Sequence, residues 1–150
     1  MIEESWKAMP VAVKRVYESA SRSDGARVLV DRLWPRGLRK IEAAVDEWFR
    51  NLAPSDELRK WTHAQPGRWL VFRKRYLKEL ARPEAENDLQ KLYRLAHKRK
   101  RLTLLYASKN QEHNNAVVLK ELLEGMRKPP TGTGPGALRL MRRDAAVRRR

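Results

Sequence analysis

Residues 27–37 have the sequence Arg-Val-Leu-Val-Asp-Arg-Leu-Trp-Pro-Arg-Gly, a short apolar run that ends in an acid and two arginines. The aliphatic residues at 28–30 predict a strand, and their continuous apolar character indicates burial on both faces of a sheet. Residues 11–17 (VAVKRVY) and 102–106 (LTLLY) predict two more strands of the same kind. Because helical spacing fills much of the chain between the last two strands, the predicted class is α/β.

The residues between the second and third predicted strands have the spacing of helices. Apolar side chains at positions 45, 48, 49 and 52 predict a first helix over this segment. Ser55 is predicted to cap a short helix that reaches residue 61, and Pro66 to open a longer one. A further helix is predicted from about residue 84 into the basic run at 97–101. The last is expected from Asn114 to about residue 124.

This order of elements predicts a small, mostly parallel sheet of about three or four strands, packed by helices in a single compact domain over residues 1–126. The long helical connection before the strand at 102–106 is what a parallel crossover requires. The connection between the first two strands, through a turn at residues 21–25, is much shorter. Its length favours either an antiparallel neighbour or a very compressed crossover, so the orientation of the first strand stays open.

The 150-residue chain is strongly basic, with 34 Lys and Arg against 18 Asp and Glu and a net charge of +16. That excess favours an anionic partner, either a small molecule or a nucleic acid. Cysteine is absent, which excludes disulfides, thiol catalysis and cysteine-ligated metal sites. The three histidines lack the spacing of metal ligands, so neither a metal nor a cofactor is expected. No apolar run is long enough for a bilayer span, so we expect a cytoplasmic protein without a membrane partner.

Residues 127–150 differ from the rest of the chain in composition. Eight basic residues and one acid follow residue 126, together with a Pro- and Gly-rich stretch at 128–136. Such a segment has too little apolar mass for a core, and we expect a disordered basic tail. The tail either binds polyanions nonspecifically or serves solubility alone.

The loop after the second predicted strand contains the first candidate site residues. If the strands at 27–31 and 102–106 run parallel, the loops that follow them leave the same sheet edge, where open α/β sheets bind ligands. Arg32 and Arg36 suit a phosphate or carboxylate, and Trp34 suits stacking on a planar ligand. The alternative is an internal ion pair between Asp31 and an arginine, with Trp34 covering the core. In either case we expect Asp31 to be ionised and paired with an arginine.

The loop after the third predicted strand leads into a helix N-terminus, where free backbone N–H groups favour an anion. Lys109 and Asn114 are candidate ligand-binding residues, although Asn114 or Asn115 is the natural N-cap of the helix, which alone would explain the two asparagines. Glu112 and His113 are candidate acid/base groups, together with Asp31. A lone histidine is more often structural, so these catalytic assignments compete with a purely structural interpretation.

Four motifs carry a family resemblance. They are residues 27–37, the segments LAPS at 52–55 and LRKW at 58–61, the pair RW at 68–69 with Phe72 and Tyr76, and EHNNAVVL at 112–119. Together they resemble the YeaO-like branch of the bacterial and archaeal family called domain of unknown function 488, over about residues 11–124. The resemblance implies a single compact, intracellular α/β domain whose motif loops line a common cleft. It implies no particular reaction.

Two functions of different classes fit these observations. The first is a binding module whose two loops hold a phosphate, a nucleotide or a nucleic-acid backbone. The second is an enzyme that uses Asp31, Glu112 or His113 as acid/base on a phosphorylated or nucleotide-like substrate. A third interpretation is a structural polar network accompanied by a nonspecific basic tail. We favour the anion-binding domain and leave enzymatic activity open. The sequence gives no expectation for the oligomeric state.

Overall fold

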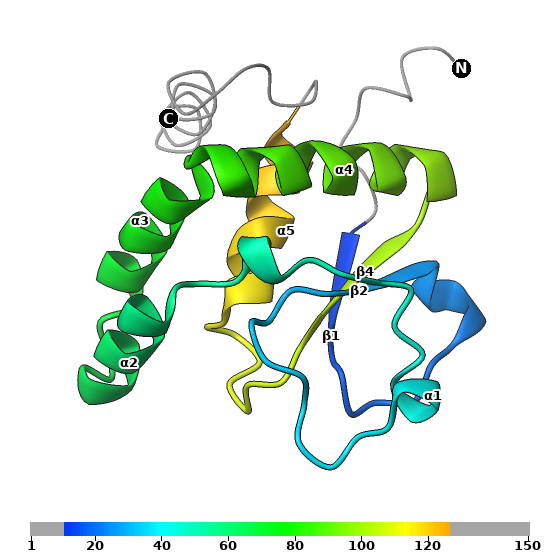
Figure 1. The fold of residues 1–150 in the computed structure, drawn as a ribbon, viewed down its shortest axis with the longest axis horizontal. Coiled ribbons are helices and arrows are strands. Elements are labelled where there is room, and N and C mark those ends of the chain that lie inside the picture. Colours follow the sequence, from blue (N-terminus) through cyan, green and yellow to red (C-terminus); the bar gives the residue numbers. More distant parts are fainter. Residues whose placement is uncertain (1–10, 127–150) are drawn as a thin grey trace.

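Four parallel strands in the order β1-β4-β2-β3 form the sheet of the computed structural model, which describes residues 11–126 (Figure 1). The strands are β1 (Val11–Arg15), β2 (Ala26–Leu29), β3 (Glu47–Trp48) and β4 (Leu102–Tyr106). β4 pairs with both β1 and β2 and is central to the sheet. The predicted α/β class and parallel sheet are confirmed. The predicted tail at 127–150 lies outside the described residues.

The first strand runs parallel and lies beside β4 rather than beside β2. Residues 16–25 connect β1 to β2 and contain one 3₁₀ turn, η2 (Arg22–Asp24), which Ser21 caps by accepting a hydrogen bond from the Ser23 N–H. Of the two alternatives for this connection, the compressed crossover is therefore correct. It leaves a gap between β1 and β2 that β4 fills.

The helix predicted over residues 45–52 is wrong. The segment forms the edge strand β3, followed by the 3₁₀ turn η3 (Arg50–Leu52). The N–H groups of Asp46 and Phe49 donate to the carbonyls of Arg27 and Leu29 on β2, at 2.8 and 3.0 Å. A strand followed by a tight turn buries the same apolar positions as a helical turn would. The strand forms rather than the helix because the free edge of β2 provides backbone acceptors for its N–H groups.

The helices otherwise follow the predicted order. The predicted ones are α2 (Asp56–Ala64), α3 (Trp69–Leu80), α4 (Pro83–Arg99) and α5 (Asn115–Gly125). The short helix α1 (Lys40–Ala43) was not predicted. The two predicted caps are confirmed: Ser55 accepts from the Leu58 N–H at 3.1 Å, and Asn114 from the Val117 N–H at 3.0 Å. α3 begins at Trp69, three residues after the predicted start at Pro66.

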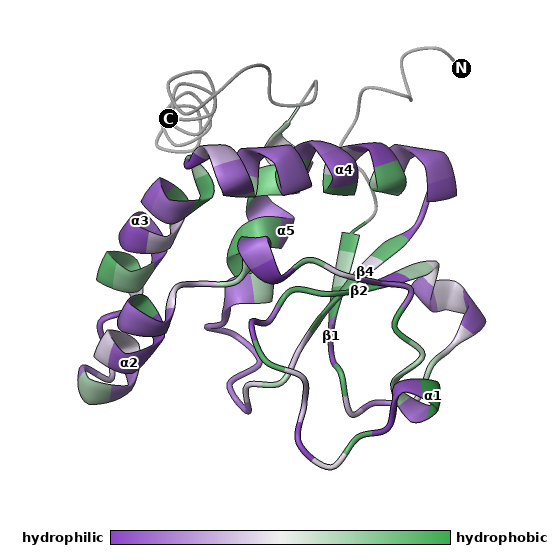
Figure 2. Cartoon of the chain, in the orientation of Figure 1, coloured by the Kyte–Doolittle hydropathy of each residue, from purple (hydrophilic) through white to green (hydrophobic). Residues whose placement is uncertain are grey.

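The two faces of the sheet are covered unequally. The larger core lies between one face and helices α2–α5, and it includes Val28, Leu104, Tyr76 and Leu119. The smaller core lies on the other face, around Leu29 and Leu105, beneath α1 and the chain at 34–45. In Figure 2 the strands are largely hydrophobic, whereas α2, α3 and α4 are mostly hydrophilic. Between residues 11 and 126, none of the helices combines the length and apolar character needed to cross a membrane.

Candidate functional site

The loops after β2 and β4 meet at the carboxylate of Asp31. Its Oδ2 accepts a hydrogen bond of 2.9 Å from the backbone N–H of Ala107, directly after β4. Its Oδ1 accepts a bond of 3.0 Å from Nδ2 of Asn115, the first residue of α5. The same Asn115 nitrogen donates to the Val30 carbonyl at 2.8 Å. One side chain therefore joins the ends of two neighbouring strands to the start of a helix.

The expected ion pair between Asp31 and an arginine does not form among residues 11–126. The donors to its carboxylate are the neutral amides of Asn115 and Ala107. Burial raises the pKa of Asp31, and these two hydrogen bonds offset part of the rise. Trp48 adds a further contact, since its indole N–H donates to the Asp31 carbonyl at 2.7 Å. Sequence reasoning missed this role of Asn115 because the residue is also a plausible helix cap.

Arg32 is directed toward the start of α2. Its Nε donates to the Pro54 carbonyl at 3.2 Å, and its Nη2 lies 3.5 Å from the Ala53 carbonyl. Both acceptors are neutral, and within the described chain no carboxylate pairs with this guanidinium. Arg32 therefore fastens the loop after β2 to the entry of α2 while keeping its full charge.

Trp34 belongs to the smaller core. Its indole N–H donates to the Leu38 carbonyl at 2.6 Å, and its ring meets Trp48 edge-on with 5.4 Å between centroids. The side chain also packs against the cluster that contains Leu29 and Leu105. Because the donor and much of the ring are already engaged, this geometry fits the core-covering interpretation better than stacking on a ligand.

Arg15, which sequence reasoning did not single out, connects the loops of two other candidates. At the end of β1, its Nε and Nη2 donate to the carbonyls of Ser108 and Ala107 at 3.0 and 2.9 Å. Its guanidinium lies 5.0 Å from the ring centroid of Tyr17, whose hydroxyl donates to the Arg36 carbonyl at 3.0 Å. Arg15 therefore contacts the residue before Lys109 and, through Tyr17, the loop of Arg36. The strand pattern at 11–17 gave no signal for this role.

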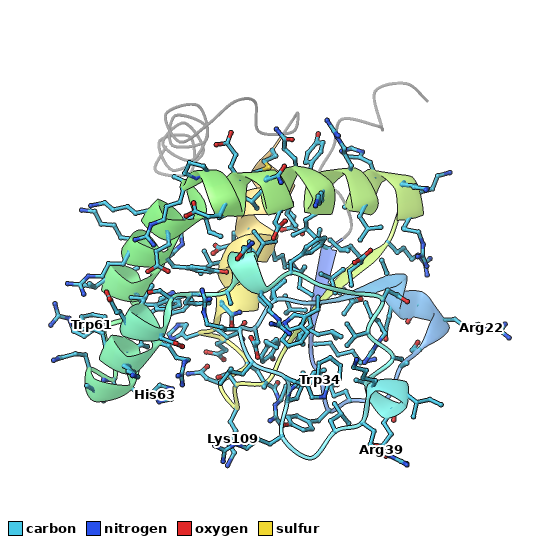
Figure 3. All side chains as sticks on the ribbon, in the orientation of Figure 1. Arg22, Trp34, Arg39, Trp61, His63 and Lys109 are labelled. Carbon is cyan, nitrogen blue, oxygen red and sulfur yellow. The ribbon has the colours of Figure 1, made fainter. Side chains whose placement is uncertain are left out.

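Arg36 and Lys109 themselves are exposed. Figure 3 shows Lys109 at the lower edge of the view, extending outward from the loop after β4. Neither side chain has an ion pair within the described part of the chain. Both cations with unengaged charge thus belong to loops whose backbones are contacted by Arg15 or by its neighbour Tyr17.

The loop between β4 and α5 is organised by Asn110. Its Oδ1 accepts hydrogen bonds from the N–H groups of Glu112 and His113 at 3.0 and 2.9 Å. Its carbonyl accepts from Nδ2 of Asn114 at 2.9 Å, while Oδ1 of Asn114 caps α5. The side chain of Asn114 is therefore used on both sides by the protein itself, which favours the capping interpretation over ligand binding.

His113 contacts α3 rather than Asp31. Its ring stacks on Trp69 with 4.5 Å between centroids and 9° between planes. Trp69 in turn stacks on Phe72 at 5.4 Å, and Phe72 lies 5.6 Å from Tyr76. The Glu112 side chain is exposed. The three candidate acid/base groups are therefore not assembled into one cluster by any contact in the described residues.

A second polar cluster lies at the opposite end of β2. Nη1 of Arg27 is 2.7 Å from Oδ2 of Asp24, and Nζ of Lys14 is 3.2 Å from the same oxygen. Burial by itself would raise the pKa of Asp24, but the bonds from Arg27, from the Ser21 N–H and from Lys14 outweigh it and hold the pKa below its usual value. Unlike Arg15 and Arg32, Arg27 is neutralised where it lies, so this cluster is structural.

A cavity of about 210 Å³ also lies at that end of the sheet and not at the predicted edge. Its lining comprises Val11, Ala12, Ser23, Arg101, Leu102 and Thr103. Within residues 11–126, no three His, Asp or Glu side chains are grouped as metal ligands would be.

The fold and the Asp31 junction define a small, all-parallel α/β domain whose strand-end loops are fastened by a half-buried carboxylate. Over residues 10–131 the chain matches a family described as the inactive DUF488-N3 subclade, and it belongs to that family. It is 47% identical to the uncharacterized protein YeaO of Escherichia coli K12 over 118 residues, which cover 79% of this chain and 100% of YeaO. It is 44% identical to the uncharacterized protein Rv3073c of Mycobacterium tuberculosis H37Rv over 115 residues, covering 77% and 94% of the two chains. No solved structure matches it.

Proposed function

We propose that the domain is a non-catalytic binding module for a small anion that carries phosphate, held at the carboxyl edge of the sheet by Arg15, Arg36 and Lys109. The observation that carries the proposal is the hydrogen bonding of Arg15. Its guanidinium donates to the carbonyls of Ala107 and Ser108, and no carboxylate pairs with it within residues 11–126.

Carbonyl acceptors orient a guanidinium without cancelling its charge. A fixed guanidinium with unused N–H groups is suited to a planar or tetrahedral oxyanion. The exposed cations Arg36 and Lys109 belong to the two loops that Arg15 and Tyr17 fasten. Arg32, which is likewise bonded only to carbonyls, adds positive charge beside Asp31.

Binding is favoured over catalysis by the arrangement of the acid/base candidates. Asp31 uses both oxygens on Ala107 and Asn115, and His113 is stacked on Trp69. An enzyme that used Asp31, Glu112 or His113 on a phosphorylated substrate would need these groups to converge. The description of the matching family as inactive points the same way.

The test is a titration of the ¹⁵N-labelled full chain with inorganic phosphate, AMP and ATP, followed by amide chemical shifts. We expect saturable shifts in residues 36–37 and 107–109, and their loss in the double variant Arg36→Gln/Lys109→Gln. The matched control is Arg39→Gln/Lys40→Gln, which removes two exposed charges from α1 and its cap. Equal weakening in both double variants, or no saturable shift with any probe, rejects the proposal.

A further inference from the structure

The positive charge of the described domain is distributed very unevenly. Residues 59–101, from the middle of α2 to the residue before β4, contain 14 Lys and Arg against four Asp and Glu. The remaining parts, residues 11–58 and 102–126, contain 11 of each sign. α2 itself begins with two acids, Asp56 and Glu57, so residues 56–101 carry +8 of the net +10 over residues 11–126. Most of the excess positive charge therefore lies on the helical segment α2–α4 and the two residues that follow it.

These helices form one continuous layer. Figure 1 shows α2 and α3 along the left of the molecule and α4 across the top, while the strands and α1 lie lower and to the right. Figure 2 colours most residues of this layer as hydrophilic. The excess Lys and Arg residues of these three helices therefore lie on the same side of the molecule.

The outer side of α4 carries a row of cations. Lys91, Arg94 and Lys98 lie at i, i+3 and i+7, which places them on one face of the helix, and all three are exposed. None of them forms an ion pair within the described residues. The row spans about 10 Å at 1.5 Å per residue. Over that length a nucleic-acid duplex presents about six phosphate charges.

Stabilisation of the helix end does not account for this charge. The macrodipole of a helix amounts to about half a negative charge at its C-terminus. Four consecutive cations, at residues 98–101, occupy the last turn of α4, its C-cap and the residue after it. On α3, Lys74 and Lys78 continue the exposed cationic surface one turn apart, and Arg75 lies 4.3 Å from the ring centroid of Trp61. Most of the excess is therefore free to attract an anion.

We propose that the outer face of α3 and α4 is a docking surface for the phosphate backbone of a nucleic-acid duplex, with Lys91, Arg94 and Lys98 as its central contacts. This surface is distinct from the edge around Arg15 and takes a polymer rather than a small ligand. Binding through it depends on phosphate contacts and is therefore independent of base sequence.

A membrane surface is the less suitable partner. Helices that lie on bilayers pair their cations with bulky apolar side chains that enter the acyl region. The large exposed apolar residues of the described chain are Tyr17, Leu33, Ile41 and Leu70, and none of them is on α4. Leu70 lies in the first turn of α3, so the row of cations on α4 has no large exposed apolar side chain beside it on that helix to insert into lipid.

The experiment compares two triple variants of the full chain in fluorescence anisotropy with a labelled DNA duplex of random sequence. The first, Lys91→Gln/Arg94→Gln/Lys98→Gln, removes the row on α4. The matched control, Arg22→Gln/Arg39→Gln/Lys40→Gln, removes three exposed cations from the neutral part of the domain. Figure 3 shows Arg22 and Arg39 away from the helical layer, at the right and lower right. Both variants keep the basic residues after 126.

Each phosphate contact contributes about 0.9 to the slope of log affinity against log salt. We expect the α4 variant to lose up to about 2.7 of that slope, so that between about 50 and 200 mM salt its affinity falls about 40-fold less than that of the parent. The control keeps the parental slope.

Equal effects in the two variants would mean that net charge alone matters and would overturn the inference. So would a parental affinity in the α4 variant. A parallel sedimentation assay uses vesicles that contain phosphatidylserine. Loss of vesicle binding with unchanged duplex binding in the α4 variant would assign the surface to lipid and overturn it as well.

Discussion

The side-chain amide of Asn115 holds the carboxylate of Asp31 at 3.0 Å, although the two residues are separated by 84 positions in the chain. The contact fastens the first turn of α5 to the end of β2, and the neighbouring bond to Val30 doubles the attachment. The loops after β2 and β4, which contain the candidate residues of the sheet edge, meet at this junction.

Replacing Asn115 by alanine should destabilise the domain. The change removes one donor from the half-buried Asp31 carboxylate and the Asn115 donor from the buried Val30 carbonyl, and an unsatisfied buried acceptor costs about 1–3 kcal/mol. Urea unfolding measures the loss. Gln111→Ala, in the exposed part of the preceding loop, is the control and should change the free energy of unfolding very little. Equal free energies of unfolding for the two variants would contradict the stabilising role assigned to the Asn115 side chain.

Replacing Glu86 by leucine should stabilise the domain at neutral pH. Glu86 is 2% exposed, and neither carboxylate oxygen has a hydrogen-bond partner in the described chain. Burial raises the pKa of Glu86, so the folded state binds the proton more tightly than the unfolded chain. Its contribution to stability is therefore full at low pH and is lost as the pH rises through the folded pKa.

The gain from Glu86→Leu should accordingly be larger at about pH 7 than at about pH 4, close to the unfolded pKa of a glutamate. Unfolding free energies at the two values test this. Glu84→Leu changes an exposed acid on the same helix and should give no comparable gain. A constant difference across pH would show that the pKa of Glu86 is the same in the folded and unfolded states, and would contradict the effect of burial.

Replacing Arg27 by methionine should cost about 3–5 kcal/mol, because it leaves the charge of Asp24 buried beside fewer donors. The guanidinium also donates to the Ala43 and Ala44 carbonyls at 2.8 and 3.1 Å, and these would lose their partner. Thermal unfolding of Arg27→Met against Arg22→Met, an exposed arginine nearby, measures the difference. A loss no greater than that of the control would refute the structural role.

Two glycines with positive φ should respond differently to alanine. At Gly25 (φ 64°) a Cβ would collide with the backbone carbonyl of Arg101, whereas at Gly37 (φ 73°) it would meet nothing within 4 Å. Gly37→Ala should therefore cost only the conformational term of about 1–2 kcal/mol. Gly25→Ala should cost clearly more, because the backbone just before β2 or just before β4 must also shift. Unfolding midpoints of the two variants check the order.

Local patterns predicted much of this structure, because helix caps and buried strands depend on residues that are close together in the sequence. Ser55 and Asn114 cap helices as expected, and residues 102–106 form the central strand. The edge strand β3 was not predictable in this way. Its two residues become a strand only because β2 offers them unpaired acceptors from elsewhere in the chain.

The candidate site was predictable in outline only. That the loops after β2 and β4 approach each other follows from parallel strands, and Asp31 does contact Ala107. Which side chains contact Asp31 and His113 cannot be predicted from the spacing of residues in the sequence. Asn115 rather than an arginine reaches Asp31, and His113 stacks on Trp69. The uneven charge can be counted from the sequence, but its meaning depends on α2–α4 forming one layer.

The position of β4 between β1 and β2 also sets the order in which the molecule can fold. The first two strands are adjacent in the chain but do not pair with each other. β2 can pair with β3 once residues 47–48 are present, whereas β1 has no strand to pair with until residues 102–106 are present. At translation rates of about 5–20 residues per second, roughly 70 residues of synthesis after β2 take about 4 to 14 seconds. During that interval the apolar strand β1 of an emerging chain has no partner strand.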